Sequence, residues 1–399
     1  MGATWFAGGQ ALIDGSLVRA DIAVADGVIV DTAVRAAATD GAQVVDCADL
    51  VVAPGFIDLQ CNGANGVDIT NEPHRIADVA SGLARFGVTA FLPTVVTSPA
   101  ATRTAAIEEI RDIRGQTPVV PDVIAAAPLG LHFEGPMISL DHLGAHVERF
   151  AVDPAVLLDE VDTWASSGAV AMVTLAPELA RATEVIGRLR AAGVVVSAGH
   201  TGMTPSDFAA ARSAGVTYVT HLFNAMAPFG HRSPGPIGAV LADPTVSVGI
   251  ICDGIHVDPV AVEMAWRTLG SQRMSLVSDA SPALGAPYGR FELGGFEVIH
   301  DETGVRTVDG VLAGSALPLD RAVRNLIEFT GCSLADALAT VTTTPADLLG
   351  LTDRGRIAVG ARADFTIVDR SGQLQRTVIA GKTAWKASSR RHEPSWQPL

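Results

Sequence analysis

The hydrophobic positions of this chain fall into short, continuous apolar runs, and most of these runs are separated by stretches with helical periodicity, such as 76–86 and 179–192. Repeated strand–helix units of this kind predict a parallel sheet. Eight of them is the number found in a (β/α)8 barrel, so the pattern predicts an α/β fold of that type. The eight predicted strands are residues 51–57, 89–96, 129–133, 170–175, 194–198, 217–220, 246–252 and 274–278.

Both ends of the chain carry a different pattern. Short apolar runs near the N-terminus are broken by Asp14-Gly15 and Asp26-Gly27, which are hairpin turn signals. A similar pattern returns near the C-terminus, in residues 355–382. We therefore expect a small β-sandwich domain made from both ends, residues 1–52 and 354–399, flanking a barrel domain of residues 53–353. An extra hairpin is expected over 291–311, followed by helices over 319–329 and 333–349.

Several predicted strands end in residues suited to chemistry. His200 and His221 follow two consecutive strands, and Glu134 follows a third. Strand ends meet at one face of a barrel, so these side chains are expected to lie together. A catalytic zinc takes three protein ligands and leaves one position open, which His2Glu satisfies. One such histidine alone would more often be a core or loop residue, but the set of three favours a metal.

Two further residues are candidates for catalysis. Asp279 follows the eighth strand and could act as general base and then general acid, although its surroundings also resemble a helix N-cap. His256 lies in a turn, Asp253-Gly254-Ile255-His256, and could polarise a carbonyl group. A turn with an incidental histidine explains that sequence equally well.

Two loops carry candidate substrate contacts. His142 and His146 have helical i, i+4 spacing, but Gly144 between them and the lack of a HExxH glutamate argue against a second zinc pair. We expect this segment to be a loop over the barrel mouth that contacts substrate. Arg232 lies in a loop rich in glycine and proline and could clamp an anion, or it could be a surface arginine.

Composition narrows the function further. The net charge of -15 argues against nucleic acid or an anionic membrane as partner. No apolar run is long enough to span a bilayer, and the N-terminus lacks the pattern of a signal peptide. The four cysteines show no paired spacing, so a cytoplasmic location is expected. The only lysines are Lys382 and Lys386, which excludes lysine-based mechanisms from the chain before residue 382.

Five motifs together resemble the N-acetylglucosamine-6-phosphate deacetylases, a family of the amidohydrolase superfamily. The resemblance runs from Pro54 to Phe365 and so covers most of the chain. The motifs are His132-Phe133-Glu134-Gly135-Pro136, Gly199-His200-Thr201, Thr220-His221-Leu222-Phe223-Asn224-Ala225-Met226, Asp253-Gly254-Ile255-His256 and Leu312-Ala313-Gly314-Ser315.

The resemblance implies an activity and a role for each residue. The reaction would be hydrolysis of the acetamide of N-acetyl-D-glucosamine 6-phosphate to D-glucosamine 6-phosphate and acetate. Glu134, His200 and His221 would hold the metal, Asp279 would be the acid/base, and His256 would contact the acetamide carbonyl. Arg232 would reach the sugar phosphate across the interface of a homodimer. The expected substrate contacts are Ala145, His146, Asn224, Ala225, Arg232, His256, Leu312, Ala313 and Gly314.

The first predicted strand bears on the number of metals. Most members of the superfamily carry His-x-His there and many add a carboxylated lysine, whereas this chain has Gln60 and Asn62 and no lysine nearby. Amides are poor ligands for a second cation, and Cys61 between them points to the opposite face of a strand. We expect one divalent ion per subunit, zinc first, with iron, cobalt and manganese also compatible.

Two other functions fit part of the pattern. A metal-dependent hydrolase of another N-acyl or cyclic amide would keep the metal ligands but not the preference for a sugar phosphate. A non-catalytic sensor of amino-sugar phosphates would not need the His2Glu set or Asp279, so the presence of both argues against it.

Overall fold

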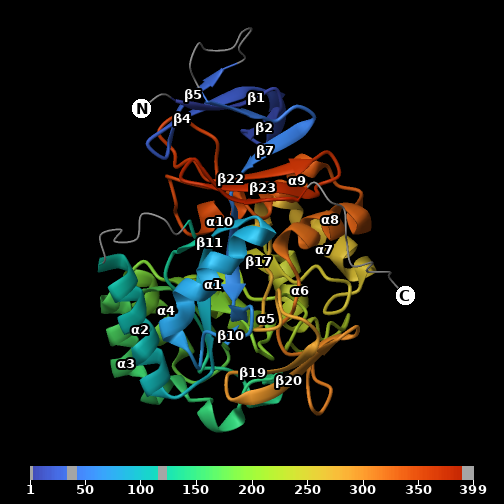
Figure 1. Ribbon diagram of the computed structural model, residues 1–399. Coiled ribbons are helices and arrows are strands. Elements are labelled where there is room, and N and C mark those ends of the chain that lie inside the picture. Colours follow the sequence, from blue (N-terminus) through green and yellow to red (C-terminus); the bar gives the residue numbers. More distant parts are fainter. Residues whose placement is uncertain (1–2, 34–42, 116–123, 389–399) are drawn as a thin grey trace.

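The computed structural model describes residues 3–33, 43–115, 124–388, and these form a barrel with a β-sandwich at one end (Figure 1). The sandwich contains the first and last parts of the described chain, blue and red in Figure 1, and the barrel contains the middle. The predicted fold, a (β/α)8 barrel with a small sandwich built from both chain ends, is therefore confirmed.

The barrel consists of eight parallel strands in chain order, each paired with the next, and a ninth short strand, β12 (Ala127–Pro128), pairs with the second of them in the same sheet. Its strands are buried on both faces because helices cover the outside and side chains fill the inside, which explains their continuous apolar sequence. The strands are β8 (Phe56–Cys61), β11 (Val88–Val96), β13 (Leu131–Glu134), β14 (Val170–Leu175), β15 (Val195–Ala198), β16 (Val216–Val219), β17 (Ser247–Ile250) and β18 (Met274–Leu276).

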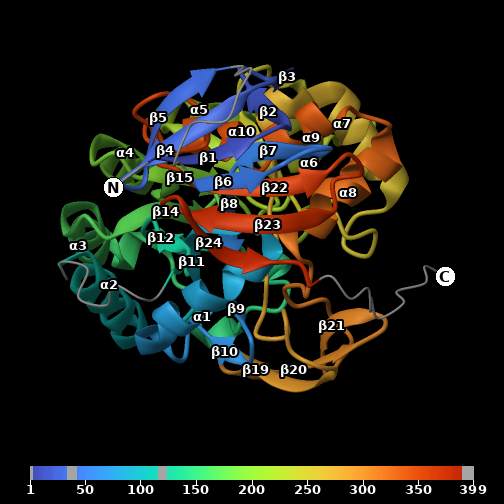
Figure 2. The same cartoon turned by 45° about the horizontal axis from the view of Figure 1, so that its top comes forward.

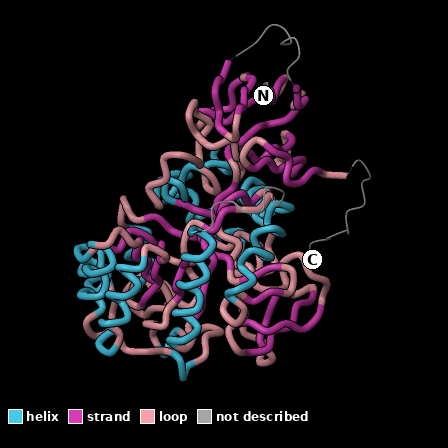
Figure 3. The backbone as a smooth tube through the Cα atoms, turned by 60° about the vertical axis from the view of Figure 1, so that its left-hand side comes forward, coloured by secondary structure: helices cyan, strands magenta, loops and turns pink. Residues whose placement is uncertain are grey.

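The helices pack around this sheet, as the cyan segments in Figure 3 show. Helix α5 begins with Thr204 as its N-cap and a capping box with Asp207, which fixes where the chain turns back after the fifth strand. None of the helices in the described part of the chain has the length and apolarity of a membrane span. The helices are α1 (Ile76–Leu83), α2 (Ala100–Gly115), α3 (Leu158–Ser167), α4 (Ala182–Ala191), α5 (Pro205–Ala214), α6 (Gly235–Ala242), α7 (Pro259–Arg273), α8 (Leu319–Thr330), α9 (Leu334–Ala339) and α10 (Thr343–Leu348).

The sandwich has a four-stranded and a six-stranded sheet, whose strands gather at the top of Figure 2 and share one apolar core. Its core joins the two chain ends directly, because the ring of Phe6 lies 5.1 Å from that of Phe365. The first sheet has the order β5 (Val28–Ala33), β4 (Asp21–Ala25), β1 (Thr4–Ala7), β6 (Gln43–Asp46). The second has the order β24 (Lys382–Lys386), β23 (Leu374–Ile379), β22 (Phe365–Asp369), β7 (Leu50–Pro54), β2 (Gln10–Ile13), β3 (Ser16–Arg19). The expected sandwich residues 1–2, 34–42 and 389–399 lie outside the described part.

The prediction of one barrel strand over 51–57 is wrong. The apolar run is divided at Gly55: β7 before it pairs with β22 in the sandwich, and β8 after it is the first barrel strand. A Cβ at Gly55 would lie 2.1 Å from Thr89 Oγ1, so only glycine allows the chain to pass from one sheet to the other here.

The expected hairpin after the eighth strand is a three-stranded antiparallel sheet, β19 (Gly289–Leu293), β20 (Phe296–Asp301) and β21 (Gly304–Thr307). Its first turn contains Gly294 and Gly295, both with positive φ, as a tight hairpin requires. The Gly294 N–H donates a 2.7 Å hydrogen bond to the buried carboxylate of Asp68. This bond fastens the turn to the segment that follows β8, so the insertion forms a wall beside the barrel mouth.

Candidate metal centre and active site

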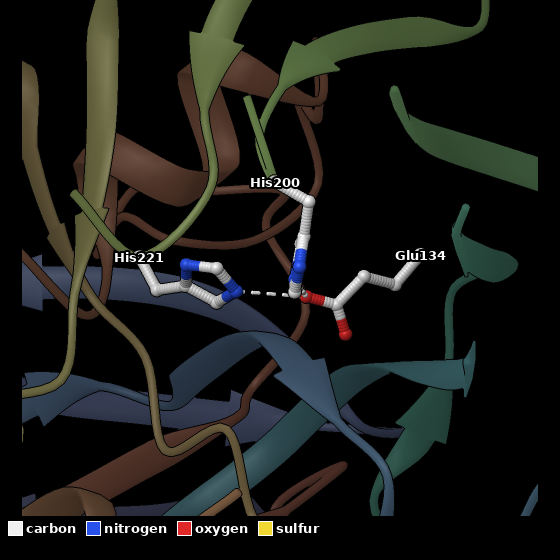
Figure 4. A group of neighbouring side chains, drawn as sticks. All are labelled: Glu134, His200 and His221. Carbon is white, nitrogen blue, oxygen red and sulfur yellow. Dashed lines mark hydrogen bonds and ion pairs between the residues drawn. The ribbon is translucent and has the colours of Figure 1, made fainter. Parts of the chain in front are cut away.

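The three predicted metal ligands lie at or just after the ends of three barrel strands. Glu134 is the last residue of β13, and His200 and His221 each follow the end of a strand, β15 and β16, by two residues (Figure 4). Both histidines have positive φ, 48° and 30°, a conformation that costs free energy for residues other than glycine. This backbone strain occurs where each strand end turns toward the mouth, at residues expected to be functional.

The ligand atoms converge on one point. Glu134 Oε1 lies 2.8 Å from His221 Nε2 and 3.1 Å from His200 Nε2, and all three residues are buried. Burial alone would raise the pKa of Glu134, but the hydrogen bonds from the two histidines outweigh it and hold the pKa well below the usual range. The same contact raises the pKa of His221 against the effect of its burial. Glu134 is therefore an anion in this site.

The loop over the barrel mouth, residues 140–146, fixes the orientation of His200. Its Nδ1 lies 3.0 Å from the carbonyl oxygen of His142, at the end of the 3-10 turn η3 (Leu140–His142). A carbonyl only accepts, so Nδ1 carries a proton, and Nε2 is the nitrogen that faces Glu134 and would bind a metal ion. Metal-binding histidines are commonly held in this way, with the second ring nitrogen donating to a carbonyl.

These residues fit a divalent metal ion. Among the described residues, Glu134, His200 and His221 form a group whose ligand atoms all lie within 4.8 Å of one another. Two imidazoles and one carboxylate suit zinc and its neighbours in the first transition row better than magnesium or calcium. Three protein ligands would leave a coordination position free toward the pocket, as in catalytic rather than structural zinc sites.

Asp279 faces this group from beyond the eighth strand. It is buried, has a φ of 47°, and accepts hydrogen bonds from Asn62 Nδ2 at 2.7 Å and from Gln60 Nε2 at 3.0 Å. Gln60 Nε2 also donates to Glu134 Oε1 at 3.0 Å, so one amide bridges the two carboxylates. Burial, followed by the nearby charge of Glu134, raises the pKa of Asp279 to about 7. Asp279 is not the N-cap of any helix described, so that alternative is removed.

The mouth loop brings His146 to the metal group. Its Nε2 lies 3.8 Å from Glu134 Oε2, its ring lies 4.3 Å from that of His200, and its Nδ1 lies 2.7 Å from Thr97 Oγ1. Burial, together with the neighbouring His200, lowers the pKa of His146 to about 3, so its ring is neutral. The structure thus places residues 140–146 over the mouth as a loop and not as a helix carrying a second zinc pair.

The strand ends, this loop and the hairpin enclose one pocket. Most of the residues expected at the active site line it, whereas Arg232 is exposed in the loop after β16 and does not. Gln60 lies beside the pocket through its contacts with Glu134 and Asp279. The expected residues that line the pocket are Asn62, Glu134, Ala145, His146, His200, His221, Asn224, Ala225, His256, Asp279, Leu312, Ala313 and Gly314.

The sequence analysis missed five apolar residues that also line the pocket. Leu293 and Phe296 flank the glycine turn of the hairpin, and Val96 lies at the end of β11, where Gly294 packs against it. The other two are Ile251 and Val311. Their side chains give no chemical signal in the sequence, and only the apolar strand ends and the predicted hairpin could have suggested them.

Comparison with known proteins identifies the family of this chain. Residues 51–384 match the family model of the amidohydrolase family. The chain belongs to the amidohydrolase family. Among curated amidohydrolase relatives, human N-acetylglucosamine-6-phosphate deacetylase is 41% identical over 366 residues, covering 87% of this chain and 86% of the human one. The enzyme of that name from Bacillus subtilis is 34% identical over 340 residues, covering 85% of each chain.

Solved structures agree in fold over nearly the whole chain. N-acetylglucosamine-6-phosphate deacetylase from Pasteurella multocida superposes with a TM-score of 0.88 at 27% identity, covering 96% of this chain and 99% of that one. A variant of the Mycobacterium smegmatis deacetylase, solved in complex with N-acetyl-D-glucosamine-6-phosphate, has a TM-score of 0.85 at 28% identity and covers 96% of this chain and 100% of that one. The family resemblance expected from the five motifs is therefore confirmed.

Proposed function

We propose that this protein hydrolyses the acetamide of N-acetyl-D-glucosamine 6-phosphate and releases D-glucosamine 6-phosphate and acetate. One observation carries the proposal: the buried group of Glu134, His200 and His221 shares a pocket with Asp279, whose pKa is raised. This arrangement suits hydrolysis of an unactivated amide. The substrate is taken from the human and Bacillus subtilis relatives, which carry the name of this activity.

In the proposed reaction, Asp279 moves the proton. Its carboxylate takes a proton from the water that attacks the carbonyl carbon, and it returns that proton to the amine nitrogen as the C–N bond breaks. A divalent ion held by Glu134, His200 and His221 would supply Lewis-acid activation of the water and of the carbonyl group. His256 donates a hydrogen bond to the carbonyl oxygen while negative charge develops there. Gln60 and Asn62 hold the Asp279 carboxylate in place.

The phosphate requires a cation that the pocket of one subunit does not supply. Among the described residues that line the pocket there is no lysine or arginine. Arg232 and Phe229, whose exposed fraction is 58%, are both exposed in the loop that follows His221. A loop that exposes an aromatic side chain and an arginine suits an interface. We therefore infer a homodimer in which Arg232 of each subunit reaches the phosphate bound in the other.

The proposal also covers the identity of the metal, which rests on the chemistry of its ligands, and the cellular location, which rests on the state of the cysteines. The His2Glu set favours zinc, while iron, cobalt and manganese are also compatible. All four cysteines are free, and three of them are buried, which fits the reducing cytoplasm expected from the sequence.

A turnover assay tests the proposal. We expect the purified protein to release acetate from N-acetyl-D-glucosamine 6-phosphate, to lose this activity after chelation, and to regain it when zinc is added. Activity only on other N-acyl or cyclic amides would replace the substrate but keep the metal chemistry. Binding of the sugar phosphate with no turnover in the metal-loaded protein would contradict an enzymatic function.

A further inference from the structure

A row of hydrogen-bonded polar side chains, which we call the polar row, lies inside the barrel next to the metal ligands. Oγ1 of Thr174 on β14 lies 2.7 Å from His132 Nε2 and 2.7 Å from Thr220 Oγ1. Thr220 Oγ1 lies 2.6 Å from Ser197 Oγ. His132 Nδ1 donates to the carbonyl oxygen of Leu59 on β8 at 3.1 Å. The four side chains of the polar row are fully buried.

The hydroxyl group of Thr174 reaches the segments that carry two of the ligands. His132 lies two residues before Glu134 and on the same face of β13, because side chains alternate along a strand. Thr220 directly precedes His221. One hydroxyl group therefore joins the end of β13 to the segment that follows β16.

The methyl group of Thr174 reaches the third ligand. A Cβ at Gly199 would lie 2.7 Å from Thr174 Cγ2, so Gly199 packs against this methyl group with no room for a side chain. Gly199 directly precedes His200. In the sheet, Thr174 pairs in register with Glu134 on one side and with Ser197 on the other. Thr174 thus contacts the approach to all three ligands.

Two of the ligands need such support from their surroundings. The positive φ of His200 and His221 is strained, and strained backbone persists only where neighbouring groups hold it. Valine, isoleucine and leucine usually fill the inside of a barrel. A buried polar network in which every member is paired makes the surrounding structure rigid instead. The polar row therefore gives rigidity where the ligands leave their strands.

We propose that Thr174 is a positioning residue for the metal centre. Its hydroxyl joins His132 to Thr220 and so fixes the distance between the ends of β13 and β16, which sets the spacing of the ligands around the ion. Thr174 does not line the pocket, so it acts through the ligands and not on the substrate. The inference rests on the metal centre of the proposed function.

Two substitutions separate the hydroxyl from the methyl group. Thr174→Val keeps the methyl contact with Gly199 but removes the hydrogen bonds to His132 and Thr220. Loss of a partner behind the ligands typically weakens metal binding by about 10- to 100-fold, so the Kd for zinc should rise by at least about 10-fold. Thr174→Ser keeps the hydroxyl and should bind zinc nearly as tightly as the unmutated protein. Competition with a chromogenic chelator measures both values.

Thr366→Val is the matched control. Thr366 is as fully buried as Thr174 but lies on β22 of the sandwich, where its hydroxyl donates to the carbonyl oxygen of Gly87 at 2.6 Å and accepts from Phe56 N–H at 3.2 Å. Both valine variants should lower the free energy of unfolding of the metal-free protein, since each leaves buried polar groups unpaired. Only Thr174→Val should weaken zinc binding.

Two results would overturn the proposal. The first is equal zinc affinity in Thr174→Val and Thr366→Val, which would leave Thr174 with a structural role alone. The second is weaker zinc binding in Thr174→Ser than in Thr174→Val, which would assign the effect to packing of the methyl group.

Cobalt-loaded protein gives a readout that depends on neither stability nor turnover. The visible absorption of bound Co²⁺ changes with the arrangement of its ligands. At saturating cobalt, we expect the bands of Thr174→Val to differ in wavelength and intensity from those of the unmutated protein, and those of Thr174→Ser to match them. Identical spectra in Thr174→Val and the unmutated protein would contradict the proposal.

A double variant tests whether the polar row acts as one unit. Thr174→Val and Thr220→Val each break the connection between β13 and β16, so together they should raise the Kd for zinc by less than the product of the two single effects. Effects that multiply would contradict a connected row.

These measurements need no substrate, so they distinguish this inference from the proposed function. The expected changes in zinc affinity without hydrolysis of N-acetyl-D-glucosamine 6-phosphate would contradict the proposed function alone. Failure of the unmutated protein to bind zinc would overturn both.

Discussion

The side-chain amide of Asn62 donates a 2.7 Å hydrogen bond to the carboxylate of Asp279, across the gap between the first and eighth strands. Gln60, two residues earlier on the same face of the chain, donates to the same carboxylate oxygen. Both amides therefore present N–H groups to the space where a second cation would need electron pairs. Cys61 points elsewhere, with its Sγ 3.6 Å from the carbonyl oxygen of Gly63.

We therefore expect one tightly bound divalent ion per chain. Protein that has been stripped with chelator and reloaded with zinc should contain one zinc per chain by elemental analysis and should be fully active. His221→Gln should lose the ion, because it removes one of three ligands. Two tightly bound ions in fully active protein would contradict the one-metal site.

Replacement of Asp279 by asparagine separates metal binding from proton transfer. Asparagine has nearly the same shape but cannot take and return a proton, so turnover should fall by at least about 1000-fold. The metal content should stay at one ion per chain, since Asp279 is not among the three ligands. Substantial residual turnover in Asp279→Asn would exclude it as the general base.

The pH dependence of the reaction should follow Asp279. Burial and the charge of Glu134 raise its pKa to about 7, whereas a cation held by Glu134 lowers it. The base must be ionised, so kcat/KM should fall as the pH drops, with a midpoint between the ordinary value of 3.8 and about 7. Asn62→Ala removes a hydrogen bond that stabilises the ionised form, so the midpoint should move to higher pH. An unmoved midpoint would mean that another group controls this limb.

The sequence predicted the strand-end residues because each carries its own chemical signal and the barrel brings strand ends together. It could not show the break at Gly55. Strands β7 and β8 are both buried on both faces, so the apolar run is continuous although it belongs to two sheets. The break occurs at Gly55 because the chain there lies too close to Thr89 for any side chain, and this close approach exists only in the folded chain.

The hairpin wall was predicted as a hairpin but not as part of the site. Its placement depends on the hydrogen bond from Gly294 to Asp68, which joins residues 226 apart in the sequence. The bridge from Gln60 to both Glu134 and Asp279 is likewise a contact between distant segments. Sequence patterns predict elements and candidate ligands, whereas these contacts between distant segments complete the site.

Replacement of Arg232 should lower kcat/KM for the phosphorylated sugar but not for the sugar without phosphate. A guanidinium that pairs with phosphate contributes about 1.5–3 kcal/mol, so Arg232→Ala should lower kcat/KM for N-acetylglucosamine 6-phosphate by about 10- to 100-fold. Activity on the sugar without phosphate should change little. Arg321→Ala, an exposed arginine on α8, is the control and should leave both activities unchanged. Equal losses on both substrates would remove Arg232 from phosphate binding.

The same residue tests the homodimer. If Arg232 acts on the other subunit, a mixed dimer of Arg232→Ala and Asp279→Asn chains contains one complete site, because the Arg232→Ala chain keeps Asp279 and receives Arg232 from its partner. Random exchange of equal amounts of the two impaired variants makes half of the dimers mixed, and each mixed dimer has one complete site out of two. The mixture should therefore recover about a quarter of the activity of the same amount of unmutated dimer. No recovery after confirmed exchange would place Arg232 in its own subunit or outside the site.

Asp58 should stabilise the closure of the barrel. Its buried carboxylate on β8 accepts hydrogen bonds from Ser278 Oγ at 2.5 Å, from Ser278 N–H at 3.2 Å and from Gln60 N–H at 3.3 Å, and so joins the first strand to the segment after the eighth. Asp58→Ala leaves these buried donors without their acceptor, and the free energy of unfolding should fall by about 3 kcal/mol. Denaturant titration measures this loss. The control is Glu302→Ala, which removes an exposed carboxylate from the turn between β20 and β21 and should change the free energy of unfolding little.

The pH dependence of stability gives a second measure of Asp58. Burial raises its pKa to about 6, and the hydrogen bonds from Ser278 offset only part of that effect. A carboxyl whose pKa is higher in the folded than in the unfolded chain favours folding most at low pH, and this contribution is lost as the pH rises from about 4 to about 6. Asp58→Asn cannot ionise, so the difference in unfolding free energy between it and the unmutated protein should change over this window and be constant above it. A difference independent of pH would show that Asp58 does not titrate in this range.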